Sequence, residues 1–249
     1  MQFNPKISII TVVYNAKSLI ERTINSVLSQ TYTNIEYIII DGGSSDGTLE
    51  IAEKYQHQIA VILSGKDNGI YDAMNKGLNA ATGDYVLFLN AGDELYSCET
   101  IASIVLLGDA DVYYGNTAVV NENGVVLGDR RLTPPEELNW KSLKYGMCVS
   151  HQSFIAKRSL CDSYNLDYLI SSDIDWVICV LKKSTKITNT KNYISKFLTG
   201  GASNKHRKLA LGERFWIMVH HYGFFQTFFN HIYILFRYPV HKLLKKSMT

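Results

Sequence analysis

The sequence has few cysteines and no pattern that pairs them. Its four cysteines lie far apart, with no Cys-x-x-Cys pair and no spacing typical of a zinc site; they are Cys98, Cys148, Cys161 and Cys179. The first residues also lack the charged and then apolar pattern of a secretory signal. We therefore expect free thiols rather than disulfides, and a reducing, cytoplasmic setting.

Long apolar runs are absent as well. No uninterrupted stretch reaches the ~20 apolar residues that a membrane-spanning helix needs. Residues 216–236 contain no Lys, Arg, Asp or Glu, but three histidines, Gln226 and Asn230 make them too polar for such a helix. We also find no internal repeat, no low-complexity segment and no Gly-rich phosphate loop of the G-x-G-x-x-G or Walker type.

Charge divides the chain into two regions. The 249 residues carry a formal net charge of +2 and are 46% hydrophobic, enough for one sizeable core. Residues 205–249 contain eight Lys or Arg, one acidic residue (Glu213) and five of the seven histidines. The rest of the chain has an excess of acids. We therefore expect a main domain over residues 1–204 and a basic, aromatic, helical extension over 205–249.

Within the main domain, short apolar runs alternate with helical patterns. Residues 7–14, 35–40, 60–63 and 86–89 are typical of buried strands. Between them, apolar residues recur at helical spacing over 20–28, 51–55 and 70–78. This order predicts an α/β domain with a parallel, nucleotide-binding type of sheet.

After Asp93 the pattern changes. We expect a helix over 100–107 and a hairpin of strands 111–120 and 125–131, turned at 121–124. Ser172 to Asp175 resembles a capping box that leads into a helix over 176–181. Residues 193–198 have the composition of a further short strand.

The stretch from Gly83 to Leu95 is central to the functional interpretation. Its strand is followed by Asn90, Ala91, Gly92, Asp93 and Glu94. Ligands bind at the carboxyl ends of strands in open α/β sheets, and hard cations prefer oxygen ligands. The alternative interpretation is a loop that only caps the next helix.

Four segments together resemble family 2 glycosyltransferases of the GT-A fold, in particular bacterial enzymes of surface-polysaccharide synthesis (colanic acid, capsule and O-antigen). The resemblance covers about residues 5–203, and its motifs are residues 9–15, 41–48, 67–77 and 89–93. It implies a GT-A (nucleotide-diphospho-sugar transferase) fold, with a Rossmann-like, mostly parallel sheet flanked by helices.

The resemblance also implies a donor site. Asp41 would read the uracil or ribose edge, and the turn at Asp67 would form a second wall. The residues that match donor-nucleotide positions are Thr11, Val13, Tyr14, Asn15, Asp41, Gly43, Ser44, Asp67, Asn68, Gly69, Asp72, Asn75, Lys76, Asn90 and Ala91.

The metal motif of the family is altered in this sequence. Asn90 and Gly92 occupy the two acidic positions of Asp-x-Asp, so Asp93 is the remaining carboxylate. The resemblance still implies a divalent cation, Mn²⁺ or Mg²⁺, at Asp93, since an ion on a diphosphate takes many ligands from phosphate and water.

Asp173 matches the catalytic acidic position, where it would act as general base. Asp175 is the natural rival for that role, and Asp173 could instead be only a helix N-cap. Acceptor-side or lid positions are matched by His151, Gln152, Asp175, Gly200 and Gly201. His151 by itself is more often a packed, hydrogen-bonded residue.

The extension allows two interpretations. Its aromatic residues recur at helical spacing with basic residues around them, which suits a helix lying on an anionic membrane surface. Alternatively, a helix pair packs on the main domain or on a partner subunit. Nucleic acid is not expected, because no stacking platform or recognised motif is present.

These observations predict an inverting hexosyl- or N-acetylhexosaminyltransferase. The donor would be a nucleotide-diphosphate sugar, most simply a UDP-sugar, and the acceptor a hydroxyl of a lipid-linked glycan. The enzyme would be peripheral on the inner face of the bacterial cell membrane. Two rivals remain open at this point: a sugar nucleotidyltransferase and a non-catalytic scaffold that binds nucleotide sugar and membrane.

Overall fold

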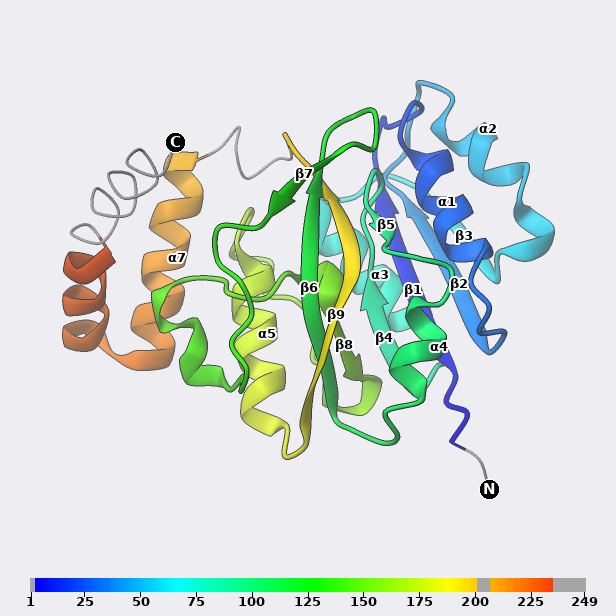
Figure 1. The fold of residues 1–249 in the computed structure, drawn as a ribbon. Helices are drawn as coiled ribbons and strands as arrows, with labels where there is room; N and C mark the ends of the chain where they lie inside the picture. The colour runs from blue at the N-terminus through cyan, green and yellow to red at the C-terminus, as the bar shows by residue number, and fades with distance from the viewer. Residues whose placement is uncertain (1–2, 201–206, 235–249) are drawn as a thin grey trace.

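The computed structural model describes residues 3–200 and 207–234 (Figure 1). A nine-stranded sheet runs through its centre in the order β3-β2-β1-β4-β8-β6-β9-β5, with β7 paired to β6. Its first half is parallel and consists of β1 (Ile7–Val13), β2 (Ile35–Asp41), β3 (Val61–Ser64) and β4 (Tyr85–Phe88). This is the predicted strand–helix alternation.

The second half of the sheet is mixed. It contains β5 (Glu94–Leu95), β6 (Val112–Val120), β7 (Val126–Asp129), β8 (Phe154–Lys157) and β9 (Ile187–Leu198). β8 is antiparallel to both β4 and β6, whereas β6 and β9 are parallel. β5 follows β4 in the chain, yet it pairs with β9 at the other end of the strand order. The sheet therefore curls back on itself beside the end of β4.

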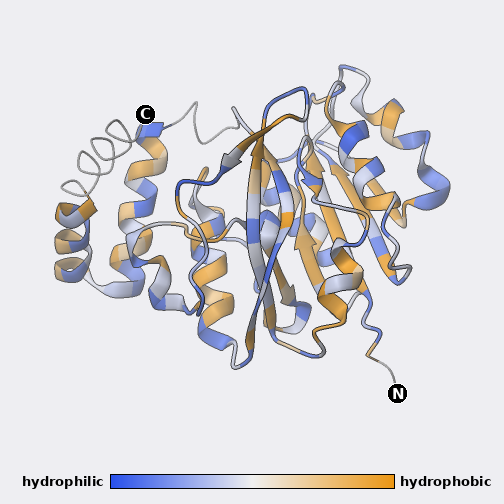
Figure 2. Cartoon of the chain, in the orientation of Figure 1, coloured by the Kyte–Doolittle hydropathy of each residue, from blue (hydrophilic) through white to orange (hydrophobic). Residues whose placement is uncertain are grey.

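Helices cover both faces of this sheet. They are α1 (Ile20–Leu28), α2 (Thr48–Glu53), α3 (Ile70–Ala80), α4 (Thr100–Val105), α5 (Ser172–Lys183) and α7 (Arg207–Tyr222). Successive residues of β1 point to opposite faces: Ile10 joins a core with Met74 of α3 and Trp176 of α5, and Ile9 joins a core with Ile24 of α1. The parallel strands β1, β2 and β4 are accordingly apolar along most of their length (Figure 2).

The expected fold class is confirmed, including the hairpin of β6 and β7. Four local features differ from what the sequence predicted. β5, β8 and the first half of β9 were not predicted. The capping box at Ser172 is also wrong: α5 already begins there, no side chain caps it, and the Ser172 hydroxyl donates to the Asn165 carbonyl at 2.8 Å.

The extension begins with a helix that packs on the main domain. α5 lies between α7 and the sheet (Figure 1), and Ile217 and Met218 of α7 join the core around Trp176. Residues 224–234 continue as a further helix. The predicted boundary at 204/205 falls within 201–206, outside the described residues. Among the described helices, none has both the length and the apolar character to cross a membrane.

Candidate active site

Asp41 stands where three parallel strands end together. It pairs in register with Val13 of β1 and Ser64 of β3, and its side chain is buried. Its Oδ2 accepts hydrogen bonds from the N–H groups of Gly43 (3.1 Å) and Ser44 (3.0 Å) and from the Ser64 hydroxyl (2.6 Å). Its Oδ1 is buried without a partner among the described residues. One carboxylate oxygen therefore stays available to a ligand that donates a hydrogen bond.

Two side chains flank this strand edge. A Cβ placed on Gly42 would lie 3.0 Å from Asp67 Oδ2 and 3.4 Å from Cδ2 of Tyr14, so both approach the backbone closely there. Tyr14 is 66% exposed, which leaves a large aromatic surface beside Asp41. Lys76 forms an ion pair with Asp67 and approaches Asp72 at 3.6 Å. An exposed ring next to a free carboxylate oxygen suits a planar base that carries an N–H group.

The turns behind these walls are held by local hydrogen bonds. Asn15 has a φ of 46°, and its side chain accepts from the N–H of Ser45 at 2.9 Å while its own N–H donates to the Ser44 hydroxyl at 2.8 Å. The Asn68 N–H donates to Asp72 at 2.9 Å, next to Gly69 with its φ of 113°. The two turns are thus fixed before any ligand arrives.

A second cluster joins three segments that are far apart in the sequence. Nδ2 of Asn90, after β4, lies 3.3 Å from Nε2 of His151, and His151 Nδ1 lies 3.4 Å from Oδ2 of Asp173 in the first turn of α5. An amide NH₂ only donates, so His151 Nε2 accepts and the ring proton sits on Nδ1, facing Asp173. The Tyr71 hydroxyl of α3 donates to Oδ1 of Asp173 at 3.2 Å. Residues expected separately as donor, lid and base are therefore neighbours.

Asp173 is set up to carry a negative charge. Burial alone would raise the pKa of Asp173, but the hydrogen bond from His151, the charge of Arg214 and the Tyr71 hydroxyl outweigh it and hold the pKa below the usual range. Burial, followed by the charge of Asp173, raises the pKa of Tyr71 well above its usual range, so Tyr71 remains a donor. A carboxylate ionised at neutral pH can accept a proton.

Asp93, the expected metal ligand, already has partners on both oxygens. Oδ1 accepts from the N–H of Leu198, the last residue of β9, at 2.9 Å, and Oδ2 accepts from Nε2 of Gln152 at 2.7 Å. The residue is 4% exposed, and burial raises the pKa of Asp93 to about 6 in spite of these bonds. Asp93 thus links the end of β4 to β9 and to the segment that precedes β8. Its direct binding of an ion stays a prediction.

The residues at the end of β4 offer few protein ligands for a divalent cation. Gly92, with a φ of 97°, replaces an acid, and a Cβ there would lie 2.9 Å from the side chain of Leu198. Asn90 Oδ1 is buried without a partner among the described residues. The one group of His, Cys, Asp and Glu residues found close enough together to hold an ion, within 3–200 and 207–234, is Asp175, Cys179 and His221, between α5 and α7. The end of β4 therefore fits an ion that a diphosphate carries with it, rather than a cage built from protein alone.

Several expected site residues have structural partners instead. Thr11 is buried and donates to the Leu89 carbonyl at 2.8 Å, and Val13 belongs to the core. The Asn75 side chain accepts from the N–H of Tyr164 (2.7 Å) and donates to its carbonyl (3.0 Å). Asp175 contacts His221 Nε2 at 2.6 Å. For these residues a part in substrate binding rests on the resemblance alone.

The glycine segment after β9 is described only at its start. Gly200 is exposed with a φ of 97°. Gly201 lies outside the described residues. Ala91 makes a backbone contact with β1, in which its N–H donates to the Val12 carbonyl at 3.3 Å.

Glu213 is a residue that the sequence analysis did not assign. From α7 its carboxylate accepts the N–H groups of Leu169 (2.7 Å), Ile170 (2.9 Å) and Ser171 (2.9 Å), and it is 9% exposed. These amides immediately precede the first turn of α5, which carries Asp173. Glu213 therefore positions the candidate base. Its signal in the sequence is that it is the single acid of a basic extension.

Comparison with known proteins gives a consistent assignment. The model of the family described as "Glycosyl transferase family 2" matches residues 8–164. A PGL/p-HBAD biosynthesis glycosyltransferase of Mycobacterium tuberculosis is 30% identical over 212 residues, 80% of either chain. The Escherichia coli UDP-Glc:alpha-D-GlcNAc-diphosphoundecaprenol beta-1,3-glucosyltransferase WfaP is 28% identical, over 98% of this chain and 96% of its own.

Solved structures share the fold. Staphylococcus aureus TarS 1–349 in complex with UDP has a TM-score of 0.67 at 19% identity, and covers 86% of this chain. The mannosyltransferase PcManGT of Pyrobaculum calidifontis, in complex with GDP-Man and Mn²⁺, has a TM-score of 0.62 at 17% identity and covers 92% of this chain. This chain spans 64% of each of those two solved chains.

The link between Asp93 and Gln152 can be tested by removing its donor. Gln152→Met keeps the size of the side chain but leaves Oδ2 of a buried carboxylate without its partner, so we expect a loss on the order of 2 kcal/mol in the free energy of unfolding. The Leu198 N–H, bound to the other oxygen, should exchange faster with solvent. Chemical denaturation and amide hydrogen exchange measure the two effects. Gln58→Met, at an exposed position, is the control, and equal stability of the two variants would contradict the prediction.

Proposed function

The chain belongs to glycosyl transferase family 2, and on that basis we propose the specific reaction: transfer of a hexosyl or N-acetylhexosaminyl group from a UDP-sugar to a hydroxyl of a lipid-linked glycan, with inversion at the anomeric carbon. One observation carries the proposal. The contacts from Asn90 through His151 to Asp173 set an ionised carboxylate beside the end of β4, where a GT-A fold receives the donor.

The donor part of the proposal rests on the edge around Asp41. A uracil ring offers an N–H group to the free Asp41 Oδ1 and a flat face to the exposed Tyr14 ring. The relative WfaP is named for a UDP-Glc donor, and TarS has been solved with UDP and with UDP-GlcNAc. A UDP-sugar is therefore the donor that we propose.

The chemical step needs a base and stabilisation of a leaving group. Asp173 accepts the proton of the acceptor hydroxyl, while His151 and Tyr71 hold its two oxygens in place. Displacement in a single step by that hydroxyl inverts the anomeric centre, and it leaves UDP near Asn90. Asp175 is a weaker candidate for the base, because it contacts His221 of α7 and not the residues at the end of β4.

We further propose that the diphosphate arrives with Mn²⁺ or Mg²⁺. Such an ion would stabilise the charge of the departing diphosphate as a Lewis acid. Asn90 Oδ1 would be one protein ligand for it, and Asp93 would join as a ligand by exchanging its bond to Gln152. PcManGT, solved with GDP-Man and Mn²⁺, is a precedent on the same fold.

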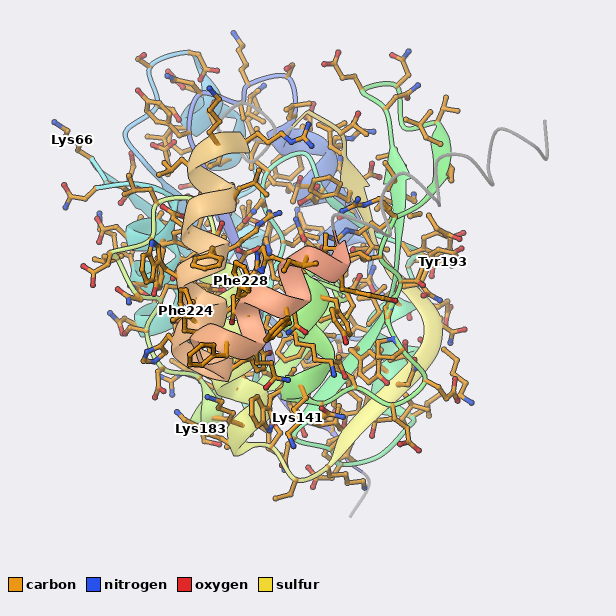
Figure 3. All side chains as sticks on the ribbon, turned by 90° about the vertical axis from the view of Figure 1, so that its left-hand side faces the viewer. Lys66, Lys141, Lys183, Tyr193, Phe224 and Phe228 are labelled. Atoms are coloured by element: carbon orange, nitrogen blue, oxygen red, sulfur yellow. The ribbon has the colours of Figure 1, made fainter. Side chains whose placement is uncertain are left out.

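The acceptor part of the proposal concerns the membrane. The WfaP name specifies a diphosphoundecaprenol-linked acceptor, which resides in a lipid bilayer. The helix of residues 224–234 carries exposed aromatic rings, including Phe225 (78%) and Phe229 (65%), and Figure 3 shows Phe224 and Phe228 on the same helix. Lys141 and Lys182 stack on Trp140, which itself stacks on Tyr222 at the end of α7. Aromatic rings next to lysines suit the surface of an anionic bilayer, so we place the enzyme peripherally on the inner face of the bacterial cell membrane.

The donor is tested first by isothermal titration of UDP, GDP and dTDP, each with and without Mn²⁺. We expect UDP to bind most tightly and Mn²⁺ to strengthen its binding. Asp41→Asn should weaken UDP by about tenfold, since the free carboxylate oxygen loses its charge. Asp167→Asn, at an exposed position, serves as control. The UDP assignment would be rejected if GDP or dTDP bound more tightly than UDP, or if none of the three bound.

The base is tested by Asp173→Asn. The variant should keep UDP affinity within about threefold and lose turnover by roughly 100-fold or more, because the amide cannot accept the proton. Asp175→Asn should lose far less. In the wild type, protonation of Asp173 should reduce turnover only at a pH below the usual range of a carboxyl group, because its pKa is held below that range. Near-normal turnover of Asp173→Asn, with a large loss in Asp175→Asn, would transfer the role to Asp175.

Membrane binding is tested by flotation with vesicles of phosphatidylglycerol and of phosphatidylcholine. The wild type should float with the anionic vesicles, and replacing Phe224, Phe225, Phe228 and Phe229 together by serine should abolish this. The control replaces Leu106 and Leu127, exposed apolar residues outside the extension, by serine. If both variants float like the wild type, the extension is not the membrane contact.

A further inference from the structure

Two arginines near Asp173 have buried nitrogen atoms without partners. Nη1 of Arg130 and Nε of Arg214 are both inaccessible to solvent and make no hydrogen bond to any described residue. Neither side chain forms an ion pair within the described part of the chain, although other arginines and lysines do. Buried N–H donors of a charged group are costly to leave unpaired, so they point to a ligand.

The two side chains come from different parts of the fold and approach the same carboxylate. Arg130 follows β7 and lines a small cavity with Cys148 and Ser150, directly before His151. Arg214 is the next residue after Glu213 on α7, and the Glu213 carboxylate holds the turn before Asp173. The pKa shifts agree with this placement. The charge of Arg214 helps to lower the pKa of Asp173. Burial lowers the pKa of Arg130; the charge of Asp173 acts against this shift, and the charge of Arg214 adds to it.

The carboxylates beside these arginines already have hydrogen-bond partners. His151 and Tyr71 contact both oxygens of Asp173, and the oxygens of Glu213 accept the N–H groups of residues 169–171. The charges of Asp173 and Glu213 balance the two guanidinium groups, but the buried N–H groups of Arg130 and Arg214 have no acceptor among the described residues. A guanidinium matches the paired oxygens of a phosphate, and two of them match the separated charges of a diphosphate.

We propose that Arg130 and Arg214 form a binding site for a diphosphate group beside Asp173. This rests on the proposed function, which supplies two such groups: the diphosphate of the nucleotide sugar and the diphosphate of a lipid-linked acceptor. Arg214 lies on α7, next to the helix with the exposed aromatic rings, whereas the donor edge is at Asp41 and Asn90. The placement favours the diphosphate of the acceptor.

The site gives α7 two functions in neighbouring residues. Glu213 positions the turn that carries the base, and Arg214 holds the anionic part of the substrate that the base acts on. Binding of the acceptor at Arg214 therefore strengthens the packing that places Asp173. A helix that lies between the membrane-facing aromatic surface and the reacting hydroxyl is suited to this coupling.

The experiment compares binding of two pairs of ligands. Geranyl diphosphate and geranyl monophosphate probe the acceptor side, and UDP and UMP probe the donor side, each titrated into wild type, Arg130→Gln, Arg214→Gln and the control Arg207→Gln, which changes an exposed arginine of the same helix. We expect the wild type to prefer geranyl diphosphate over the monophosphate by about tenfold or more, and each of the two variants to lose that preference. UDP binding should then change by less than about threefold.

Each other outcome also decides the question. If the preference for UDP over UMP is lost instead, the site exists and serves the donor. If both preferences stay within about twofold of wild type in both variants, the proposal is wrong and the arginines only maintain the charge of Asp173, which a shifted pH profile of turnover would then show. Should a variant fail to fold, the wild type is sufficient, because equal affinity for geranyl diphosphate and monophosphate overturns the proposal.

Failure of the proposed function remains distinguishable. A wild-type protein that neither binds UDP nor hydrolyses UDP-sugars would reject the glycosyl-transfer proposal itself, and the geranyl titrations would still decide whether the arginine site exists. A wild-type protein that binds UDP, with arginine variants that bind all four ligands normally, rejects the arginine site alone. Arg130→Lys and Arg214→Lys, which keep the charge but lose the planar fork, should show intermediate losses.

Discussion

The closure of the curled sheet depends on the Asp93 carboxylate. Burying a charge without partners is very unfavourable, and the two hydrogen bonds from Leu198 and Gln152 are what make this position tolerable. They also connect the end of β4 with the last residue of β9 and with the segment before β8. Gly92, next to Asp93, has a φ of 97°, which side chains other than glycine rarely adopt, and a Cβ there would lie 2.9 Å from the Leu198 side chain. The backbone conformation at this position therefore favours glycine over the acid of the family's metal motif.

A second buried carboxylate is likewise stabilised by hydrogen bonds from a distant segment of the chain. Glu213 accepts three consecutive backbone N–H groups before α5, which otherwise has no side-chain cap. The first turn of α5, and with it Asp173, is therefore held by α7 rather than by local sequence. The extension packs on the main domain at least as far as α7, as one of the two interpretations of the sequence expected. The outer helix, with its exposed phenylalanines, is the part that is free to meet a membrane.

The sequence predicted what depends on local pattern. The buried runs of β1, β2 and β4 are continuous and apolar, and the helices between them have clear periodicity, so their order and the fold class followed. β8 has four residues and β5 has two, too few for periodicity, and they become strands only because longer neighbours offer edges to pair with. The pattern at Ser172 failed because the distant Glu213 competes with a local cap. The resemblance named Asn90, His151 and Asp173, but these residues lie up to 83 positions apart, so only the folded structure shows that they are in contact. The sequence analysis missed Tyr71, Arg130 and Glu213 for the same reason.

The electrostatics of Asp173 constrain how the reaction can be accelerated. A carboxylate whose pKa is held below its usual range is always ionised near neutral pH, but it is also a weak base. As the proposed base, it would accept the proton of a hydroxyl only when that hydroxyl has begun to bond to the anomeric carbon and has become acidic. In the proposed reaction, proton transfer is therefore late, and most of the barrier is lowered at the leaving diphosphate and by positioning the acceptor. The unpartnered oxygen of Asn90 and the two arginines beside Asp173 are the groups that we propose for these two requirements.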